Sequence, residues 1–349
     1  MYEHSHNSYR SRIISYLEPS SRKYSKRLIL CQTENGPCPI IAIVNSLVLK
    51  SNNERSFSLP NKRHIASEEV NDYLIQFAKR YALCEDYDEL HGRLSTMHFG
   101  QQLNPSILDI QKFDYGDEIF KVFGIPLVHG WLFSSEIMPD DPSSLKCLQE
   151  LEYYEKIADT FAERRSLLEM PEKLTSEQTS FLENTTFVDA IMEDRFTMQF
   201  LTSSGLRKIL ELIHPGEIVV LFRSCHFSTL YSNPESLSLF TLVTDSGYAR
   251  TGEDVVWETF DDQVVETGTG ELCSANFIPA ALILNQRKEE HERRVKEDEH
   301  YARRLAQGQQ RQSRSGQNTG YSQTAHRPRN NKTPKKKQDE QQLKSCIIC

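Results

Sequence analysis

The sequence predicts an α+β protein whose body combines one buried helix, a long helical stretch and a block of strands. Residues 39–50 carry apolar side chains nearly all round the helix they would form, which is typical of a helix buried on every side. Residues 143–213 have mainly helical patterns. Residues 217–231 and 237–244 are rich in branched and aromatic side chains, which favour strands, and an Asn-Pro pair at 233–234 supplies a turn between them.

Composition divides the 349 residues into four zones. We expect a flexible N-terminal arm over 1–25, a folded body over 26–285, a charged helix over 286–307 and a disordered basic tail over 308–349. Within the body we also expect helices at 67–81, 145–169 and 203–212 and a strand at 127–131. From Gln307 onward nine Lys or Arg residues stand against two acidic ones, so the tail is basic although the whole chain has a net charge of −8.

Composition also excludes several classes of protein. The acidic net charge argues against nucleic acid as a partner of the body. No apolar stretch reaches the roughly 18 residues of a membrane helix, and the polar N-terminus lacks a secretory apolar core. We therefore expect a cytoplasmic protein with reduced thiols. The eight cysteines form no paired CxxC framework, so we expect neither a zinc site nor another cofactor.

Cys38 is the candidate nucleophile, because it lies between two prolines immediately before the buried helix. Pro39 suits the first helical position, which sets Cys38 at the N-cap. The unpaired backbone N–H groups there carry a partial positive charge, which lowers the pKa of a thiol and stabilises the thiolate. The alternative is that Cys38 is a small buried apolar residue, as free cysteines often are.

A thiolate of this kind needs a base and an oxyanion site. His226 is the preferred base because it lies in the apolar strand region 217–231, although it could also be a core histidine, and His129 is the second candidate. An early Cys on a helix with a His on a strand far downstream is the papain-like order. Either Thr244 or Asp245 could orient the imidazole. The oxyanion donors would be the backbone N–H of Cys38 and the side-chain amide of Gln32, which could instead be an ordinary polar loop residue.

Four blocks of the chain resemble the MINDY family of deubiquitinating cysteine proteases. They read QTENGPCPIIAIVN (32–45), IPLVHGWL (125–132), LFRSCHFST (221–229) and LVTDSGY (242–248), the last followed by VVWE (255–258). The resemblance covers about residues 27–280, and four blocks in one order make it more specific than a single motif.

The resemblance implies a papain-like variant fold with a mostly helical insertion, and hydrolysis of polyubiquitin, preferably of chains linked through lysine 48 of ubiquitin. It implies that Cys38 is the nucleophile, His226 the base and Gln32 the oxyanion donor, and that the supporting polar residue is Thr244. Trp131 and Phe222 match positions that contact ubiquitin; the alternative is that both are core aromatics.

The charged helix resembles the inverted ubiquitin-interacting motif that follows the catalytic domain in this family. Tyr301, Ala302 and Leu305 would form a narrow apolar stripe against ubiquitin, with the small Ala302 allowing close approach. The sequence departs from the motif at 307–309, where Gln-Gly-Gln replaces acidic residues. The alternative is a solvated charged helix.

The last four residues, Cys-Ile-Ile-Cys at 346–349, suit prenylation of Cys346. The three lysines at 335–337 would supply the basic second signal that one lipid chain needs for membrane association. We expect a monomeric cysteine isopeptidase with ubiquitin chains as its partner. The alternatives are a catalytically inactive adaptor that binds polyubiquitin, and a papain-like acyltransferase.

Overall fold

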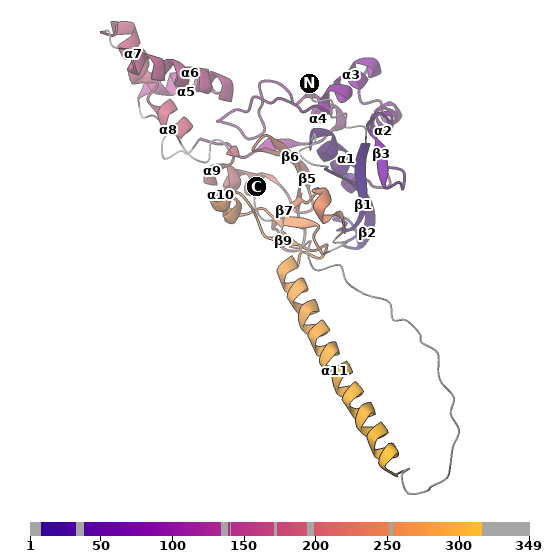
Figure 1. Cartoon of the computed structure of the whole chain (residues 1–349). Helices are drawn as coiled ribbons and strands as arrows, with labels where there is room; N and C mark the ends of the chain where they lie inside the picture. The colour runs from indigo at the N-terminus through magenta and orange to yellow at the C-terminus, as the bar shows by residue number, and fades with distance from the viewer. Residues whose placement is uncertain are drawn as a thin grey trace, which may run out of the picture. The chain divides into compact units, whose positions relative to one another are not determined.

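The computed structural model describes residues 8–32, 38–133, 139, 141–170, 173–193, 199–250 and 254–315 (Figure 1). The chain forms two compact units, Met1–Arg287 and Lys288–Cys349. The first unit mixes helices and strands, which confirms the predicted α+β class. In order, the elements are β1 Ser8–Leu17, β2 Tyr24–Cys31, α1 Cys38–Lys50, β3 His64–Ala66, α2 Ser67–Arg80, α3 Tyr87–Met97, α4 Glu118–Phe123, β4 Leu127–His129, α5 Pro142–Leu151, α6 Tyr154–Leu168, α7 Ser176–Asn184, α8 Phe187–Glu193, α9 Ser203–Leu212, β5 Ile218–Arg223, β6 His226–Ser232, β7 Leu239–Leu242, the 3-10 helix η3 Ser246–Arg250, β8 Trp257–Thr259, α10 Asp262–Thr267, β9 Leu272–Cys273 and α11 Ala280–Ser315.

The strands form two sheets. The first has the order β2-β1-β3 and the second the order β4-β5-β6-β7-β8-β9. All strand pairs are antiparallel except β4 with β5, which run parallel. A parallel pair needs a long crossover, and here the chain between β4 and β5 contains helices α5 to α9.

Strand β5 is buried on both faces, as its continuous apolar run predicts. Val220 and Phe222 belong to the core that includes the apolar side chains of α1, whereas Val219 and Leu221 belong to a second core formed with α9 and α10. The six-stranded sheet therefore lies between α1 on one face and α9 with α10 on the other. Helix α1 also packs with Ile14, Ile29 and Leu30 of the first sheet, which explains why its residues are buried on all sides.

Helix α1 is joined to the first sheet by one buried amide. The Asn45 side chain accepts the backbone N–H of Leu30 (2.8 Å) and donates to the backbone carbonyl of Leu30 (3.0 Å). Asn45 itself is fully buried. A buried amide is stable only with such partners, so the helix has one favoured register against the end of β2.

The expected flexible arm over 1–25 is wrong for residues 8–25, while residues 1–7 lie outside the described chain. Strand β1 pairs along its length with β2 and contributes core residues such as Ile14 and Tyr16. The sequence obscured this strand because Arg10 and Arg12 interrupt its apolar pattern. Both arginines turn out to have partners inside the fold.

Two other boundaries differ from expectation. The region 217–231 contains two strands, β5 and β6, joined by a two-residue turn in which Ser224 (φ 49°) and Cys225 (φ 61°) both have positive φ. Turns with two positive φ values match the twist of a tight hairpin, but the usual glycine or asparagine is absent here. The charged helix begins earlier and ends later than expected, as α11, so residues 308–315 are helical where we expected disorder. Gln and Arg favour helix there, and Gly308 costs only about 1 kcal/mol.

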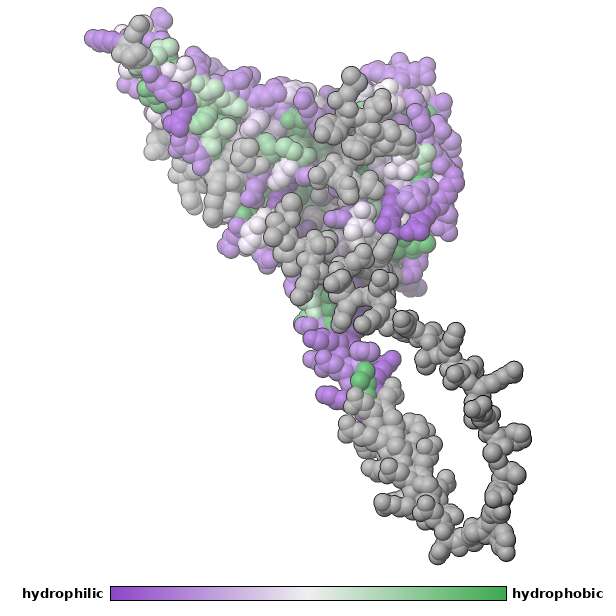
Figure 2. Space-filling model, in the orientation of Figure 1, coloured by the Kyte–Doolittle hydropathy of each residue, from purple (hydrophilic) through white to green (hydrophobic). Residues whose placement is uncertain are grey.

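Within the second unit, the structure describes side chains only for residues 288–297, and all of these are exposed. Figure 2 shows a mainly hydrophilic surface over this part of α11. No helix among the described residues is both long and apolar enough to span a membrane.

Candidate active site

Helix α1 begins at Cys38, one residue earlier than predicted. The side chain of Cys38 and residues 33–37 lie outside what the structure describes. Behind Cys38 the helix is a rigid mount, because every side chain from Ile40 to Leu49 is buried. The first N–H groups of any helix lack intrahelical partners and attract negative charge, so the position suits a thiolate.

Helix α1 and strand β6 run in the same direction. Near their beginnings, the Thr229 hydroxyl donates to the backbone carbonyl of Ala42 (3.4 Å). Toward their ends, Lys50 lines the same cavity as Ile218, whose ladder partner is Tyr231 of β6. The first residues of the two elements, Cys38 and His226, therefore lie at the same end of the sheet. Along the helix axis Cys38 lies about 6 Å before Ala42, and along the strand His226 lies about 10 Å before Thr229.

His226 is an exposed residue at the first position of β6. The alternative of a core histidine is therefore wrong. Phe227 and Tyr231 follow it on β6 and belong to the same core as the apolar side chains of α1. His226 itself is exposed at the first position of the strand. The tight turn at 224–225 fixes its place by pairing it with Arg223 of β5.

Gln32 and Thr244 are joined through their backbones. The N–H of Gln32 donates to the carbonyl of Thr244 (2.7 Å), and the N–H of Ser246 donates to the carbonyl of Gln32 (3.0 Å). Thr244 follows β7, which runs antiparallel to β6 and so ends where β6 begins. The structure thus brings the backbones of Gln32, Cys38, His226 and Thr244 to one end of the six-stranded sheet.

Thr244 and Asp245, the two possible orienting residues, have different surroundings. Asp245 is exposed, and its carboxylate accepts the backbone N–H of Gly247 (2.6 Å) at the start of η3. One oxygen of the Asp245 carboxylate is therefore engaged in its own turn. Thr244 is half-buried.

His129, the second candidate for the base, has a structural role. It is fully buried, and its Nδ1 accepts the backbone N–H of Trp131 (3.2 Å), so Nε2 carries the proton and donates to the carbonyl of Asp109 (3.1 Å). Burial lowers its pKa to about 4. A ring that is neutral and inaccessible at neutral pH cannot exchange protons with a substrate.

Trp131 and Phe222, which are expected to contact ubiquitin, are buried in the free chain. Their side chains are only 2% and 5% exposed, respectively. Both pack against Phe200, with ring centroids 5.7 Å and 5.6 Å away. The alternative interpretation, that they are core aromatics, is what the structure shows.

Three predicted binding residues lie where only the backbone is described. Tyr301, Ala302 and Leu305 are helical residues of α11, and nothing further is described of their side chains. Cys346, the predicted lipidation site, lies outside the described residues.

Arg12 is a residue near this site that the sequence did not single out. Its guanidinium donates to the backbone carbonyls of Val243 (2.7 Å), Val255 (2.9 Å) and Tyr248 (3.2 Å). These carbonyls flank Thr244 along the chain. The only available signal was the content of branched and aromatic residues at 9–17 (Tyr9, Ile13, Ile14, Tyr16), which favour a strand.

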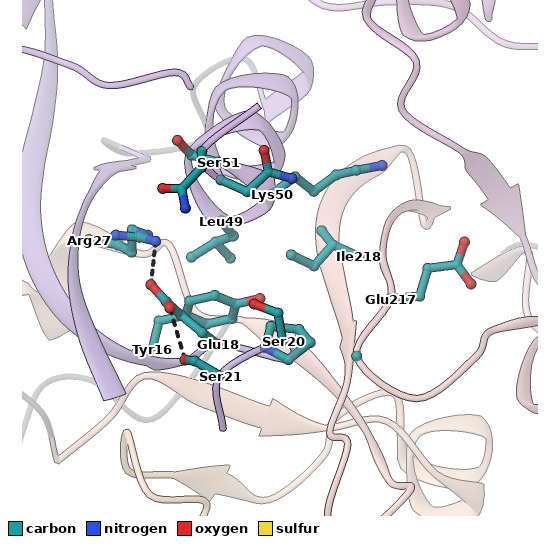
Figure 3. A pocket seen from close by; sticks show the side chains of 14 residues that line it. Tyr16, Glu18, Ser20, Ser21, Arg27, Leu49, Lys50, Ser51, Glu217 and Ile218 are labelled. Atoms are coloured by element: carbon teal, nitrogen blue, oxygen red, sulfur yellow. Dashed lines mark hydrogen bonds and ion pairs between the residues drawn. The ribbon is translucent and has the colours of Figure 1, made fainter. Parts of the chain in front are cut away.

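A cavity of about 690 Å³ lies at the opposite end of α1 (Figure 3). Lys50, the last residue of that helix, lines it together with Tyr16 and the ion pair of Arg27 with Glu18 (2.6 Å). The cavity is therefore separated from Cys38 by the length of the helix. It does not belong to the candidate active site.

Comparison with known proteins gives a consistent result. A family model described as MINDY deubiquitinase matches residues 7–277. An uncharacterized protein of Schizosaccharomyces pombe is 65% identical over 282 residues, which are 81% of this chain and 77% of that protein. Ubiquitin carboxyl-terminal hydrolase MIY1 of Saccharomyces cerevisiae is 28% identical over 272 residues, covering 76% of this chain and 72% of that protein.

The human ubiquitin carboxyl-terminal hydrolase MINDY-2 is 31% identical over 265 residues, which are 71% of this chain. The match spans only 38% of the human protein, so this chain corresponds to a minor part of it. The family model begins at residue 7, close to the start of β1, and so includes the segment that composition alone would have assigned to an arm.

Proposed function

Because the chain belongs to the MINDY deubiquitinase family and is a thiol-dependent ubiquitinyl hydrolase, we propose that Cys38 is its nucleophile and His226 its base. The observation that carries this proposal is that the first residues of α1 and β6 both lie at one end of the six-stranded sheet. Thiol catalysis needs a nucleophile and a base within reach of one carbonyl.

In the proposed mechanism the thiolate of Cys38 attacks the carbonyl carbon of the C-terminal glycine of ubiquitin. His226 donates a proton to the departing lysine amine, leaving a thioester on Cys38. A water molecule activated by His226 then releases ubiquitin. Thr244 orients the imidazole, and this Cys-His-polar order along a helix and a strand is a papain-like arrangement, which we propose for this fold.

The oxyanion donors in this mechanism are the backbone N–H of Cys38 and the side-chain amide of Gln32. Gln32 is suited to the role because its backbone is fixed on both sides by residues 244–246. A donor that is already fixed stabilises developing charge without reorganisation. The site residues need no cofactor for these steps.

We further propose a preference for chains linked through lysine 48 of ubiquitin, on the resemblance of the sequence blocks to the family. The test is incubation with tetra-ubiquitin of each defined linkage. Faster shortening of the lysine 48-linked chain than of all others supports the preference. Chains that stay intact but bound would indicate an adaptor, and new ubiquitin–amine conjugates would indicate an acyltransferase.

We propose that Tyr301, Ala302 and Leu305 of α11 bind ubiquitin. The exposure of every described side chain from 288 to 297 is compatible with a helix free to bind a partner. An isolated peptide of residues 288–315, titrated with ubiquitin, tests this idea. Matched affinities of the native and Ala302→Arg peptides would contradict it.

The remaining proposals concern location and assembly. We propose a cytoplasmic monomer that is partly held on membranes by a prenyl group on Cys346 and by the lysines at 335–337. The tail composition supports this proposal, since one lipid chain with a basic cluster is the usual minimum for stable association.

A further inference from the structure

Arg12 lies on β1 but its contacts are with the chain that follows β7. One guanidinium nitrogen, Nη2, donates to the carbonyl of Val243, and the other, Nη1, donates to the carbonyls of Val255 and Tyr248. The side chain crosses from the first sheet to the second and is only 7% exposed. Its three partners bracket Thr244 in sequence.

Arg10 extends this connection. It precedes Arg12 by two residues on the same face of β1, and its Nη1 lies 3.5 Å from the carbonyl of Ser246, to which it donates. In the ladder Arg10 pairs with Cys31, the residue before Gln32. The segment 243–248 is therefore held by β1 side chains and by the backbone of Gln32 at the end of β2.

The environment of Arg12 is unfavourable for a charge. Among the described residues no carboxylate pairs with it, and its Nε is buried without a hydrogen-bond partner. Burial accordingly lowers its pKa. Burying an ion without a counter-ion destabilises a fold by several kcal/mol. Here the three backbone carbonyls to which Arg12 donates offset that cost, and they would lose this donor if Arg12 were replaced by an apolar residue.

An arginine can do what an apolar residue cannot, because its planar group fixes several acceptors at once. Here the acceptors are carbonyls of three separate residues around one loop. We propose that Arg12 is a positioning residue for the active site, setting the place of Thr244, and through the Thr244–Gln32 backbone bond that of Gln32. The inference rests on the catalytic roles proposed above for Thr244 and Gln32.

The experiment compares the full-length wild-type protein with Arg12→Gln and Arg12→Lys in cleavage of lysine 48-linked tetra-ubiquitin. Active enzyme is counted by covalent labelling with ubiquitin that carries an electrophile at its C-terminus, so that misfolded protein does not contribute. We expect kcat per active enzyme to fall roughly 10- to 100-fold in Arg12→Gln, the scale of a small misplacement of catalytic groups. KM should stay within about two-fold, since the residue touches no substrate.

Arg12→Lys should recover part of kcat, because an ammonium group can still donate to one or two of the carbonyls. The matched control is Arg27→Gln, which removes an arginine from β2 that pairs with Glu18 beside the distant cavity. Arg27→Gln should keep wild-type kcat per active enzyme. A positioning role also predicts non-additivity: Arg12→Gln should slow a Thr244→Ala protein less than it slows the wild type, because the part of the loss that acts through the Thr244 side chain is already present.

The outcomes separate the two proposals. If Thr244→Ala keeps wild-type kcat, the catalytic role of Thr244 is wrong, and the inference about Arg12 falls with it. If Thr244→Ala is slow but folded Arg12→Gln and Arg12→Lys both keep wild-type kcat, only the inference about Arg12 is wrong. If Arg12→Gln yields no labelled enzyme, the comparison uses Arg12→Lys alone. A kcat of labelled Arg12→Lys that equals that of the wild type, or that falls only as much as that of Arg27→Gln, then overturns the inference.

Discussion

Gln32 and Thr244 are separated by more than two hundred residues of sequence, and a 2.7 Å backbone hydrogen bond joins them. Gln32 follows β2 of the three-stranded sheet, and Thr244 follows β7, the fourth strand of the six-stranded sheet. A change in either sheet is thereby transmitted to both positions. The positions of the two residues are therefore linked, as the inference about Arg12 requires.

Cys38→Ala should abolish cleavage of ubiquitin chains while leaving folding and chain binding intact, because the sulfur is needed for bond formation. Cleavage is followed by gel analysis and binding by retention of tetra-ubiquitin on immobilised protein. Cys225→Ser is the matched control, since Cys225 is an exposed free thiol immediately before His226. It should keep wild-type cleavage, and residual turnover by Cys38→Ala above the no-enzyme rate would refute the nucleophile assignment.

Gln32→Ala should lower kcat by roughly 10²- to 10³-fold, the usual loss for one oxyanion donor, with little change in KM. The measurement is steady-state hydrolysis of a fluorogenic ubiquitin substrate. Gln263→Ala, which changes an exposed glutamine of α10, should have no effect. A rise in KM with unchanged kcat would make Gln32 a binding residue instead.

His226→Ala should give a folded, inactive protein in which Cys38 reacts with iodoacetamide only at higher pH, because the thiolate has lost its imidazolium partner. Labelling of Cys38 is read by mass spectrometry of its peptide from pH 5 to 9. His214→Ala serves as control, since His214 is exposed and belongs to the turn that is bonded to Ser232, at the end of β6 opposite His226. Superimposable labelling curves for His226→Ala and wild type would count against the pair.

His129 should affect stability rather than catalysis. Its pKa of about 4 in the fold lies below the ordinary value of about 6.5 in an unfolded chain, so below pH 6.5 the unfolded state binds the extra proton. The stability from a neutral His129 is complete above pH 6.5 and is lost as the pH falls towards 4, by roughly 3 kcal/mol in all.

The measurement for His129 is urea unfolding of the wild type and of His129→Asn at pH 7, 5.5 and 4.5. Asparagine keeps an acceptor for Trp131 but does not titrate, so its free energy of unfolding should depend less on pH than that of the wild type. At pH 7 the variant should still cleave chains. Parallel pH dependences in the two proteins, or loss of cleavage by folded His129→Asn, would contradict this role.

Cys346→Ser should move the membrane-bound fraction of the protein to the soluble fraction without changing cleavage of free chains, because a lipid on one side chain supplies only reversible attachment. Fractionation of eukaryotic cells measures the first effect. The intact mass of the C-terminal peptide gives the direct test. An unmodified peptide ending at Cys349 in the membrane fraction would exclude lipidation as the cause of attachment.

The sequence predicted the elements whose local pattern is strong. Helix α1 was recognisable because apolar residues surround it. The strand region was recognisable because branched and aromatic residues fill it, although the pattern over 217–231 predicts one strand and the structure has two, β5 and β6. The start of α9 was also recognisable, since the Thr202 side chain accepts the N–H of Gly205 as an N-cap should.

What the sequence did not predict depends on contacts between distant segments. Strand β1 was missed because its arginines look like those of a solvated arm. Only the carbonyls of the chain after β7 show why Arg12 is buried and Arg10 half-buried. Trp131 and Phe222 could not be assigned to core or surface, because both carry apolar aromatic rings that suit either place. Their burial follows from packing against Phe200, which no local pattern reveals.

The pairing of Asn45 with Leu30 has a consequence for how β2 behaves as the last strand of its sheet. An exposed strand edge invites pairing with other chains, but here an amide from α1 occupies both the N–H and the carbonyl of Leu30. Aspartate would lose the donor and leucine would lose both groups, leaving buried backbone atoms unpaired. Position 45 thus admits asparagine almost alone. By occupying both backbone groups of Leu30, Asn45 closes the β2 edge at this residue. An extended peptide, including one from another copy of this chain, could otherwise join the sheet there.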